Sequence, residues 1–395
     1  MTDRINVSKP AVSIRSEIAD LKKPSGVAGE AVLRANTPQE QFNLIGAGRR
    51  NIIINGAVKV DQRGSGTIVV SGGVIGPDRF RISTYNLDNM AGTITQDSDS
   101  PNGFNNSLKI TITTAESAVA VDEYAYVSTR IEAQDLQQLG YGTVGAEFAT
   151  LSFWVKSTAI GTYAVGIYKP DNTAQISNIT YTINNASTWE YKTVTFSPNI
   201  LSGGGINDDN GIGFYINWHL AAGSNFTGGG STSGWTAYSN PKWADGHETD
   251  GVITTTNGTF QLTGVQFELG KVATPFEHRS YGEELALCQR YYYRDYAGVA
   301  YGNFITAVCQ SGTDHRGVYY LPVPMRASPS LSANGSFALL GNSMTYSSME
   351  IGDGASTGSR QPIRINSSGN NTSGYSVILR ANNDSDAYIE YDAEL

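Results

Sequence analysis

Short segments in which apolar and polar residues alternate are the feature that most restricts the fold of this chain. The segment Phe260-Gln-Leu-Thr-Gly-Val-Gln-Phe-Glu-Leu269 alternates in this way, and clusters of Gly, Asn, Asp and Pro separate such segments from one another. A period of two residues is typical of a β-strand with one buried face, and the intervening clusters mark turns. The pattern therefore predicts an all-β protein.

Residues 51–280 are expected to form one large antiparallel jelly-roll sandwich, because the candidate strands and their spacing suit two sheets packed face to face. One short helix is expected inside this unit, at Glu132–Leu139. The predicted strands are Asn51–Val60, Gly66–Ser71, Arg79–Thr84, Ser107–Thr113, Ala125–Ile131, Thr150–Lys156, Gly161–Tyr168, Thr188–Phe196, Gly211–Leu220 and Gly258–Glu268.

Residues 281–395 are expected to form a smaller C-terminal β-domain. A short helix is predicted at its start, because Glu283–Arg290 contains helix formers and neither Gly nor Pro. No repeat of fixed period is visible, which excludes a solenoid. The predicted strands are Gly317–Leu321, Ser336–Leu340, Met344–Glu350, Gln361–Asn366, Ser376–Arg380 and Ala387–Tyr391.

Residues 1–50 are too poor in apolar residues to form a core of their own. Ile14, Ile18 and Leu21 share one helical face after a possible cap at Ser13, which predicts a short amphipathic helix over Ser13–Lys23. A helix of this length is marginal in water, so we expect the segment to gain order by binding copies of itself or a docking protein. A disordered tail is the alternative.

Composition excludes several classes of function. Charged residues make up 16% of the chain, below the roughly 25% of an average soluble domain. The net charge of −9 argues against nucleic-acid binding, which needs a basic surface. No apolar run is long enough for a transmembrane helix, and the N-terminus lacks the apolar core of a signal peptide, so we expect folding in a cytoplasm and no membrane insertion.

Few residues form patterns typical of metal or catalytic sites. Cys288 and Cys309 are expected to be free and buried, with a disulfide as the alternative, and the four histidines show no zinc-binding spacing. We therefore predict no catalytic residues, no bound metal and no cofactor. Ca²⁺ bound by loop acids at residues 208–209 or 245–250 is the alternative. The carboxylates that a glycan hydrolase could use are Glu147, Glu190, Asp208, Asp209, Asp245, Glu248 and Asp250.

Aromatic side chains are the more informative candidates. Strand parity places Trp154 opposite the apolar face of its strand, while Trp218 shares the apolar face of Phe214–Leu220 and is expected in the core. Trp189 is also expected in the core, and Tyr291–Tyr293 between the two domains or between chains. The residues that fall outside the core pattern, and so become candidate stacking platforms for a glycan, are Trp154, Trp235, Tyr238 and Trp243.

The junction between the two β-units resembles one found in bacteriophage tail-fibre and related virion fibre proteins. The residues that carry this resemblance are Ala273-Thr-Pro-Phe-Glu-His-Arg279, the helix after them and Tyr291-Tyr-Tyr-Arg294. Arg50–Gly64 resembles the first strand of the same fibre domain, and with Asp78–Phe80 and Leu151–Lys156 the resemblance covers roughly residues 50–300. Leu151–Lys156, Thr188–Tyr191 and the closing strand also resemble carbohydrate-binding-module jelly rolls.

The resemblance implies a homotrimeric phage tail-fibre protein that is assembled in the bacterial host cytoplasm and resides in the virion. Residues 1–50 would attach it to a virion docking protein, and the β-domains would bind a host surface polysaccharide or protein receptor. A capsid-surface fibre or decoration protein and a polysaccharide depolymerase are the alternatives. The sequence names neither the host nor the receptor.

Overall fold

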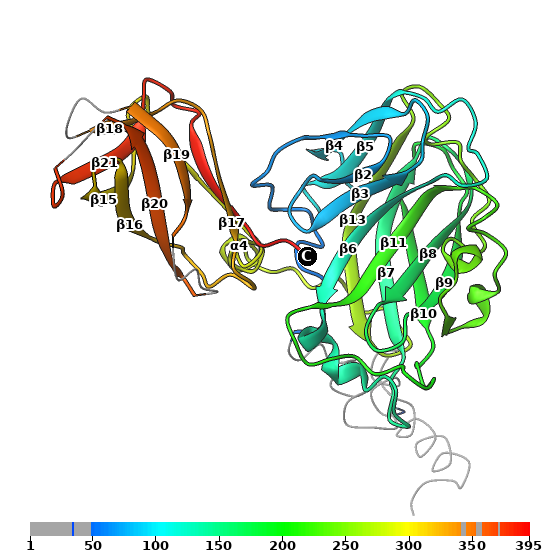
Figure 1. Cartoon of the computed structure of the whole chain (residues 1–395). Coiled ribbons are helices and arrows are strands. Elements are labelled where there is room, and N and C mark those ends of the chain that lie inside the picture. The colour runs from blue at the N-terminus through cyan, green and yellow to red at the C-terminus, as the bar shows by residue number, and fades with distance from the viewer. Residues whose placement is uncertain (1–33, 35–48, 341–344, 353–357, 370–371) are drawn as a thin grey trace, which may run out of the picture.

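The computed structural model describes residues 34, 49–340, 345–352, 358–369 and 372–395, and it is built almost entirely of antiparallel strands. The predicted all-β class is confirmed. Figure 1 shows two lobes, a large sandwich and a smaller C-terminal unit, with helix α4 (Tyr281–Gln289) at the junction between them. The predicted helix at Ser13–Lys23 and the predicted attachment segment 1–50 lie outside the described residues, except for residues 34, 49 and 50.

The sandwich consists of a six-stranded and a seven-stranded sheet. In spatial order the six-stranded sheet contains β1 (Gly66–Ile68), β4 (Ala91–Asp97), β5 (Ser107–Thr114), β13 (Thr259–Leu269), β7 (Ala149–Ser157) and β10 (Glu190–Phe196). The seven-stranded sheet contains β12 (Thr236–Ala237), β9 (Gln175–Ile183), β8 (Gly161–Lys169), β11 (Ile212–Ala222), β6 (Tyr124–Glu132), β3 (Phe80–Tyr85) and β2 (Gly72–Ile75). The 3₁₀ helices are η1 (Ala133–Leu139), η2 (Ser231–Ser233) and η3 (Asn240–Lys242).

The core lies between the two sheets and follows from the alternation within each strand. Val127 of β6 and Phe153 of β7 are fully buried between the sheets, as is Phe260 of β13. Trp218 of β11 is fully buried beside them, which confirms its predicted place in the core. Each inward residue alternates with one that faces away from the core, so the sequence that builds the core also determines which side chains cover the outer faces.

The C-terminal unit also has two sheets, which enclose a separate core. The three-stranded sheet contains β14 (Tyr292–Tyr296), β22 (Tyr388–Asp392) and β17 (Ser330–Asn334). The six-stranded sheet contains β18 (Phe337–Leu340), β21 (Ser376–Ala381), β15 (Asn303–Ser311), β16 (Asp314–Tyr320), β20 (Arg360–Ser368) and β19 (Thr345–Ile351). Cys288 in α4 and Cys309 in β15 are both buried free thiols.

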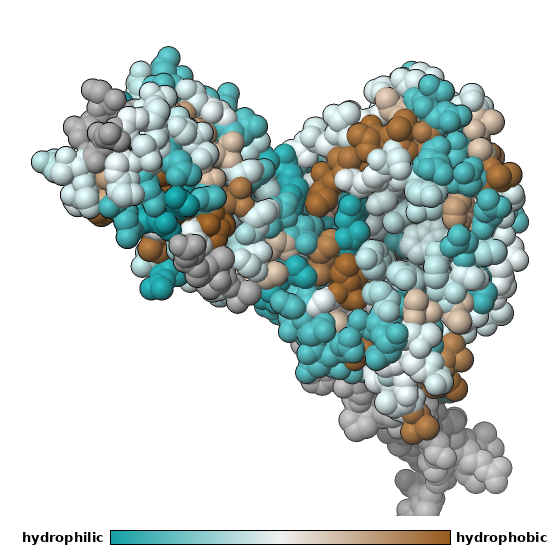
Figure 2. All heavy atoms as spheres, viewed as in Figure 1, coloured by the Kyte–Doolittle hydropathy of each residue, from teal (hydrophilic) through white to brown (hydrophobic). Residues whose placement is uncertain are grey.

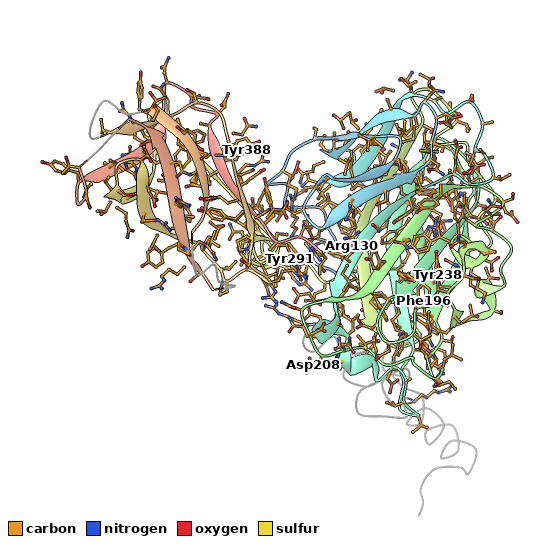
Figure 3. All side chains as sticks on the ribbon, viewed as in Figure 1. Arg130, Phe196, Asp208, Tyr238, Tyr291 and Tyr388 are labelled. Atoms are coloured by element: carbon orange, nitrogen blue, oxygen red, sulfur yellow. The ribbon has the colours of Figure 1, made fainter. Side chains whose placement is uncertain are left out.

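The junction between the units is built from arginine and tyrosine side chains. The Arg79 guanidinium carbon lies 3.4 Å from the ring centroid of Tyr291, and that of Arg63 lies 3.6 Å from the ring of Tyr292. Figure 3 shows Tyr291 at the junction, and teal hydrophilic atoms gather there in Figure 2. The predicted packing between domains is confirmed for these two tyrosines, whereas Tyr293 packs on the C-terminal core.

The predicted strand Asn51–Val60 is wrong, because the segment forms buried turns. The Asn55 side chain bonds both the main-chain nitrogen and the oxygen of Val60, which closes a turn that a strand could not contain. Gly56 lies so close to the main chain of Val265 that a Cβ would overlap its oxygen. The Asn-Gly pair is a turn signal that outweighs the apolar residues around it.

Candidate functional site

An aromatic cleft lies on the outer face of the seven-stranded sheet. The cavity has a volume of about 510 Å³, within the usual size range of ligand pockets of about 300–1,000 Å³. We call it the tyrosine cleft, and it is lined by Tyr85, Tyr124, Tyr126, Arg130, Tyr168, Tyr215, Phe226, Tyr238, Asn240 and Trp243.

Strand alternation brings these rings to one face. Tyr124, Tyr126 and Arg130 occupy alternating positions of β6, and the intervening residues, such as Val127, face the core. In register with β6, β11 places Tyr215 opposite Arg130. Each strand therefore contributes its polar-aromatic face to the cleft and its aliphatic face to the interior.

A long loop forms one wall of the cleft. It carries Phe226, Tyr238, Asn240 and Trp243, and buried hydrogen bonds fix it to the sheet. The Asn178 amide of β9 donates to the Ser231 hydroxyl and to the main-chain oxygen of Lys242, both at 2.7 Å. The Asp245 carboxylate accepts from the main-chain nitrogen of Thr232 at 3.0 Å. The Gly- and Ser-rich segment is thus a fixed wall of the cleft.

The rings contact one another in stacked and edge-to-face pairs. Tyr85 and Tyr124 stack with centroids 5.1 Å apart, and Trp243 meets Tyr126 edge-on at 5.4 Å. Tyr168 lies 5.5 Å from Tyr215. Such pairs hold each ring in one orientation, so the cleft presents preformed flat apolar surfaces bordered by hydroxyl groups.

The hydroxyl groups stay protonated at neutral pH. Burial, together with the neighbouring tyrosines, raises the pKa of Tyr124 to about 12, and burial raises the pKa of Tyr168 and Tyr238. Neutral phenols donate and accept hydrogen bonds, as sugar hydroxyls do. The cleft can therefore combine stacking with hydrogen bonding.

Two buried histidines support the loop wall from below. The His219 ring lies 6.0 Å from Trp243 and 6.2 Å from His247. Burial lowers the pKa of His247 to about 4, and burial together with His247 holds the pKa of His219 well below its usual range. Both rings are neutral at pH 7, so this part of the site is uncharged.

A lysine fixes the strand end beside Tyr168. The Lys169 side chain is fully buried, and its ammonium donates to main-chain oxygens of two loops. These acceptors are Thr173 at 3.0 Å, Gly203 at 2.9 Å, Gly205 at 3.4 Å and Asp171. We call this arrangement the carbonyl cage. It joins loops on both sides of β8 and so fixes the end of the strand that carries Tyr168.

The structure brings two of the four predicted stacking residues together in the cleft. Tyr238 and Trp243 line it, although Trp243 is only 9% exposed and contributes mainly to the wall. Trp235 packs on the sandwich core, and its indole nitrogen donates to the main-chain oxygen of Ser197 at 2.9 Å. Trp154 lies on the outer face of the six-stranded sheet, away from the cleft.

One further aromatic expectation is wrong, and several aromatic residues of the cleft were missed. Trp189 was expected in the core and is instead half-buried, with its indole nitrogen 3.1 Å from a carboxylate oxygen of Asp99. Its position just before β10 leaves it outside the alternation that buries Phe196. The main missed residues are the outward tyrosines of the sheet, whose alternation with Ala and Val in Tyr124-Ala-Tyr-Val127 was the available signal.

None of the candidate carboxylates lines the cleft, since no Asp or Glu is among the described residues that do so, and Asp245 lies within the loop wall. Glu190 is in β10 of the other sheet, and despite burial its hydrogen bonds from Lys192 and nearby main-chain nitrogens lower its pKa to about 2. Asp209 accepts from the nitrogen of Gly211 at 2.8 Å in a loop. Within the described ranges, no group of three or more His, Cys, Asp or Glu residues could hold a metal ion.

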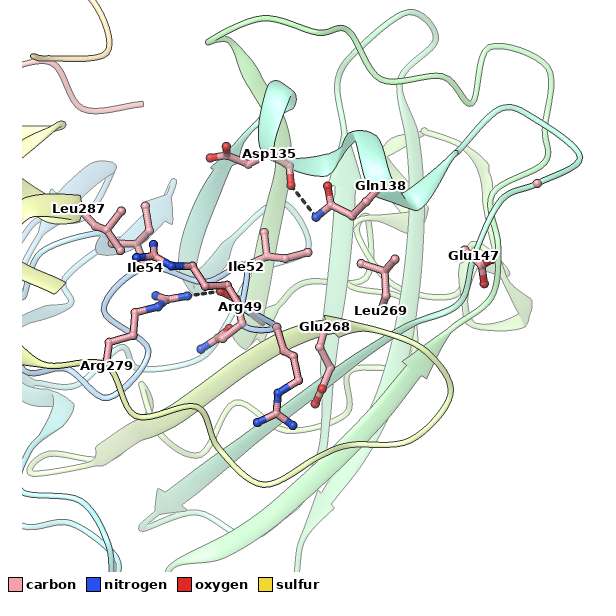
Figure 4. A pocket seen from close by; sticks show the side chains of 13 residues that line it. Arg49, Ile52, Ile54, Asp135, Gln138, Glu147, Glu268, Leu269, Arg279 and Leu287 are labelled. Atoms are coloured by element: carbon pink, nitrogen blue, oxygen red, sulfur yellow. Dashed lines mark hydrogen bonds between the residues drawn. The ribbon is translucent and has the colours of Figure 1, made fainter. Parts of the chain in front are cut away.

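A second cavity, of about 590 Å³, lies below the junction (Figure 4). Its charged lining residues are three arginines, the candidate Glu147, Asp135 and Glu268. The chain itself engages the arginines and Glu268. Arg279 donates to the main-chain oxygen of Ile53 at 2.9 Å and pairs with Glu284 at 3.2 Å, and Arg49 pairs with Glu283. We therefore attribute this cavity to packing at the junction. In the part of the chain that the structure describes, no helix is long and apolar enough to cross a membrane.

Several solved structures are similar to part of this chain, but only distantly. The tailspike protein 4 enzymatically active domain of bacteriophage CBA120 matches at 16% identity over 56% of this chain, with a TM-score of 0.31, and the match spans 21% of the tailspike chain. The CBM22-1 xylan-binding domain from Paenibacillus barcinonensis matches at 9% identity over 57% of this chain and 100% of its own, with a TM-score of 0.28.

A family 11 carbohydrate-binding module from Clostridium thermocellum, in complex with a mixed-linked tetrasaccharide, matches at 13% identity over 54% of this chain and 98% of its own, with a TM-score of 0.25. No protein-family model matches the sequence, and neither does any curated protein. These similarities identify no family for the chain.

Proposed function

We propose that the sandwich binds a cell-surface glycan in the tyrosine cleft without cleaving it. The observation that carries this proposal is the composition of the cleft: eight aromatic side chains line it, together with Arg130 and Asn240. Sugar rings present C–H faces that stack on aromatic planes, and their hydroxyls pair with phenols, amides and guanidinium groups. An aromatic, preformed cleft of this size suits such a ligand.

Binding is favoured over hydrolysis by the absence of acids among the described lining residues. Glycoside hydrolases use two carboxylates about 5–10 Å apart, on either side of the scissile bond. Asp122 lines an adjoining cavity, and its carboxylate accepts from the Asn86 amide at 3.1 Å. One acid without a partner does not support a depolymerase.

In the virion we assign the chain to a phage tail fibre that attaches the particle to its host. The residues that resemble fibre proteins, 273–294, connect β13 to α4 and the arginine–tyrosine junction, so they hold the C-terminal unit on the sandwich. A homotrimer would carry three clefts. Multivalency would then convert weak single-site binding into firm attachment, with residues 1–50 docking to the virion.

Tyr85 and Tyr191 provide a matched test of glycan binding. They are 42% and 46% exposed, the first in the cleft and the second on the opposite sheet. Tyr85→Ala should weaken binding to a microarray of bacterial-surface polysaccharides several-fold, for a stacking contribution of about 1 kcal/mol. Tyr191→Ala should leave binding unchanged. Equal effects of the two substitutions, at equal melting temperatures, would refute the assignment of the cleft.

The assembly is tested separately. Light scattering on the full chain should give about three times the monomer mass of 42.3 kDa, and a stable monomer would refute the trimer.

Immunogold labelling of the C-terminus on purified virions should mark the tail periphery. Label on the capsid would favour a decoration protein. A chain starting at Asn51 should fold but fail to join fibreless particles.

A further inference from the structure

Strand β6 belongs both to the tyrosine cleft and to the junction with the C-terminal unit. Toward its start, Tyr124 and Tyr126 line the cleft. At its end, the Glu132 carboxylate pairs at 2.8 Å with Arg290, the residue that follows helix α4. Arg130 lies between them and also lines the cleft. Figure 3 shows Arg130 on the side of the sandwich toward the junction, so a single strand connects the two regions.

The Arg130 side chain contacts residues of both units. Its guanidinium carbon lies 4.7 Å from the ring centroid of Tyr215, a cleft residue on the adjacent strand β11. One of its terminal nitrogens donates to the main-chain oxygen of Leu395, a buried residue of the C-terminal unit. The guanidinium is planar and its donors point in fixed directions, so a partner on one side restricts its position on the other. Leu395 therefore helps to hold Arg130 over Tyr215.

The segment that carries Leu395 is itself fixed to the sandwich by ion pairs. Glu394 pairs with Arg79 and, at 3.2 Å, with Arg63. Arg79 is buried, and it also donates to the main-chain oxygen of Arg130 at 2.6 Å. Loss of an ion pair that has a buried member is costly, because the remaining charge stays buried. Glu394 thus fixes the position of Leu395, and it is not among the described residues that line the cleft.

Further hydrogen bonds hold the same segment beside the second cleft strand. The Arg326 guanidinium donates to the main-chain oxygens of Ala393 at 3.1 Å and of Asn210 at 2.9 Å. Asn210 lies just before β11, the strand that carries Tyr215. The main-chain nitrogen of Ala393 donates to the oxygen of Tyr291 at 2.8 Å. Strands β6 and β11 are therefore both connected to residues 393–395, which follow β22.

We propose that Arg130 is a positioning residue through which the C-terminal unit determines the glycan affinity of the tyrosine cleft. This inference rests on the proposed function. With residues 393–395 docked on the sandwich, the guanidinium lies over Tyr215 and holds that ring in place for stacking. When the segment is released, Arg130 loses its acceptor and the ring loses this support. By linkage, a glycan that binds the docked form more tightly must strengthen the docking by the same factor.

Glu394→Gln tests the proposal without altering a residue of the cleft. Titrated on the microarray of bacterial-surface polysaccharides, the full-length variant should bind about two- to tenfold more weakly than wild type, the range expected for one cation–π contact. Glu394→Asp keeps the charge and should restore part of the affinity. Glu350→Gln is the matched control, because it removes the same charge from an ion pair with Arg364 inside the C-terminal unit, and it should leave binding unchanged. Equal losses in the two Gln variants would overturn the proposal.

A double-mutant cycle separates positioning from a general loss of stability. Arg130→Met keeps the apolar stem and removes the guanidinium, so it should weaken binding at least as much as Glu394→Gln. In the Arg130→Met background, Glu394→Gln should have almost no further effect, because the connection through the guanidinium is already lost. Additive losses in the double variant would contradict the proposal. Melting temperatures of the four proteins identify any variant that fails to fold.

Hydrogen exchange tests the reciprocal effect on the wild-type chain, where folding of a variant is not in question. The amide of Ala393 donates to Tyr291, so its exchange reports the release of the segment. Saturation with the polysaccharide that binds most tightly on the array should slow this exchange by about two- to tenfold, the same factor as the change in affinity. Exchange at Leu379 in β21, inside the C-terminal unit, should not change. An Ala393 amide whose exchange is unaffected by saturation would sink the proposal.

Two outcomes separate this inference from the proposed function. Binding that is lost in Tyr85→Ala but unchanged in folded Glu394→Gln would sustain glycan binding and overturn the role of Arg130. Binding of the wild-type chain to no polysaccharide would overturn both proposals.

Discussion

The two outer faces of the sandwich carry similar aromatic side chains in different surroundings. On the seven-stranded sheet, Trp243 descends from a fixed loop to pack on Tyr126 and Tyr168, which encloses a cleft. On the six-stranded sheet, Trp154 and Tyr191 lie 5.3 Å apart without such a wall. Next to Trp154 on the same strand face, Lys156 forms an ion pair with Asp99 at 2.6 Å. Aromatic residues alone do not make a site; a second element has to enclose them.

The largest expected difference between the faces is in stability. Trp243→Ala removes a ring that is only 9% exposed and should lower the free energy of unfolding by about 3–5 kcal/mol, the usual cost of emptying a buried tryptophan site. Trp154→Ala removes a half-buried ring and should cost about 1–2 kcal/mol. Urea denaturation of the two variants measures both values. A smaller loss for Trp243 than for Trp154 would mean that the wall is not packed on the sheet.

Acidification should lower the free energy of unfolding through the buried histidines beneath the cleft. The pKa of His247 is about 4 in the folded chain and about 6.5 unfolded, so between these values the unfolded state binds more protons. The stability that depends on neutral His247 is complete above pH 6.5 and should fall by about 2 kcal/mol by pH 5. His219 acts in the same direction. On the other face, Glu190 titrates near pH 2 and stays ionised throughout this window.

Burial raises the pKa of Asp78 at the junction to about 6, which stabilises the fold on acidification and opposes the histidine effect. The measurement is therefore the difference in unfolding free energy between wild type and His247→Gln from pH 7 to pH 5. The variant should gain about 2 kcal/mol relative to wild type over this range. A difference that does not vary with pH would show that His247 is accessible to protons in the folded state.

Substitution of Gly264 tests whether a change on the outer face of the six-stranded sheet affects glycan affinity in the cleft. Gly264 of β13 has φ +60° at a register shift, and a Cβ there would lie 2.7 Å from Phe104 and 3.0 Å from Trp154. Gly264→Ala should cost about 1–2 kcal/mol for the left-handed backbone alone. Calorimetry should show the lower melting temperature while glycan affinity stays at the wild-type value. Weakened binding would mean that the two faces are coupled.

The smallest effect concerns one hydroxyl at the rim of the cleft. The Tyr238 hydroxyl donates to the side-chain oxygen of Asn240 at 3.1 Å in an exposed position. Tyr238→Phe keeps the ring and should reduce glycan affinity by at most about 1 kcal/mol. Isothermal titration against the best ligand from the array measures this change. A loss much above tenfold would make the hydroxyl, and not the ring, the important contact.

The sequence was sufficient to predict the all-β class and most strands, because alternation is a local signal. The prediction failed where contacts with another part of the chain determine the local structure. Asn51–Val60 has apolar residues suited to a strand, but Asn55 closes a turn on Val60. Seven strands of the structure were not predicted, namely β2, β4, β9, β12, β14, β15 and β17. The C-terminal helix was predicted at 283–290 and spans Tyr281–Gln289, where the Ser280 cap accepts from the nitrogen of Glu283.

The site was harder to predict than the fold, for a physical reason. Trp235 and Trp243 lie in the same hydrophilic segment, so the local sequence does not distinguish them. In the structure Trp235 packs on the core and Trp243 on the outer tyrosines. The distinction depends on contacts with strands far away in the chain. The alternation within β6 predicts that its tyrosines face outward. It does not predict that a distant loop encloses them in a cleft.

The carbonyl cage around Lys169 has a consequence for the surroundings in which the protein works. Rings of main-chain oxygens also coordinate dissolved cations such as Ca²⁺, and the occupancy of such a site follows the concentration of the ion. Here the cation is tethered to β8, at an effective concentration that dilution cannot change. These two loops should therefore keep their shape in fresh water and in brine alike, and Tyr168 beside them should meet its ligand in the same position in either medium.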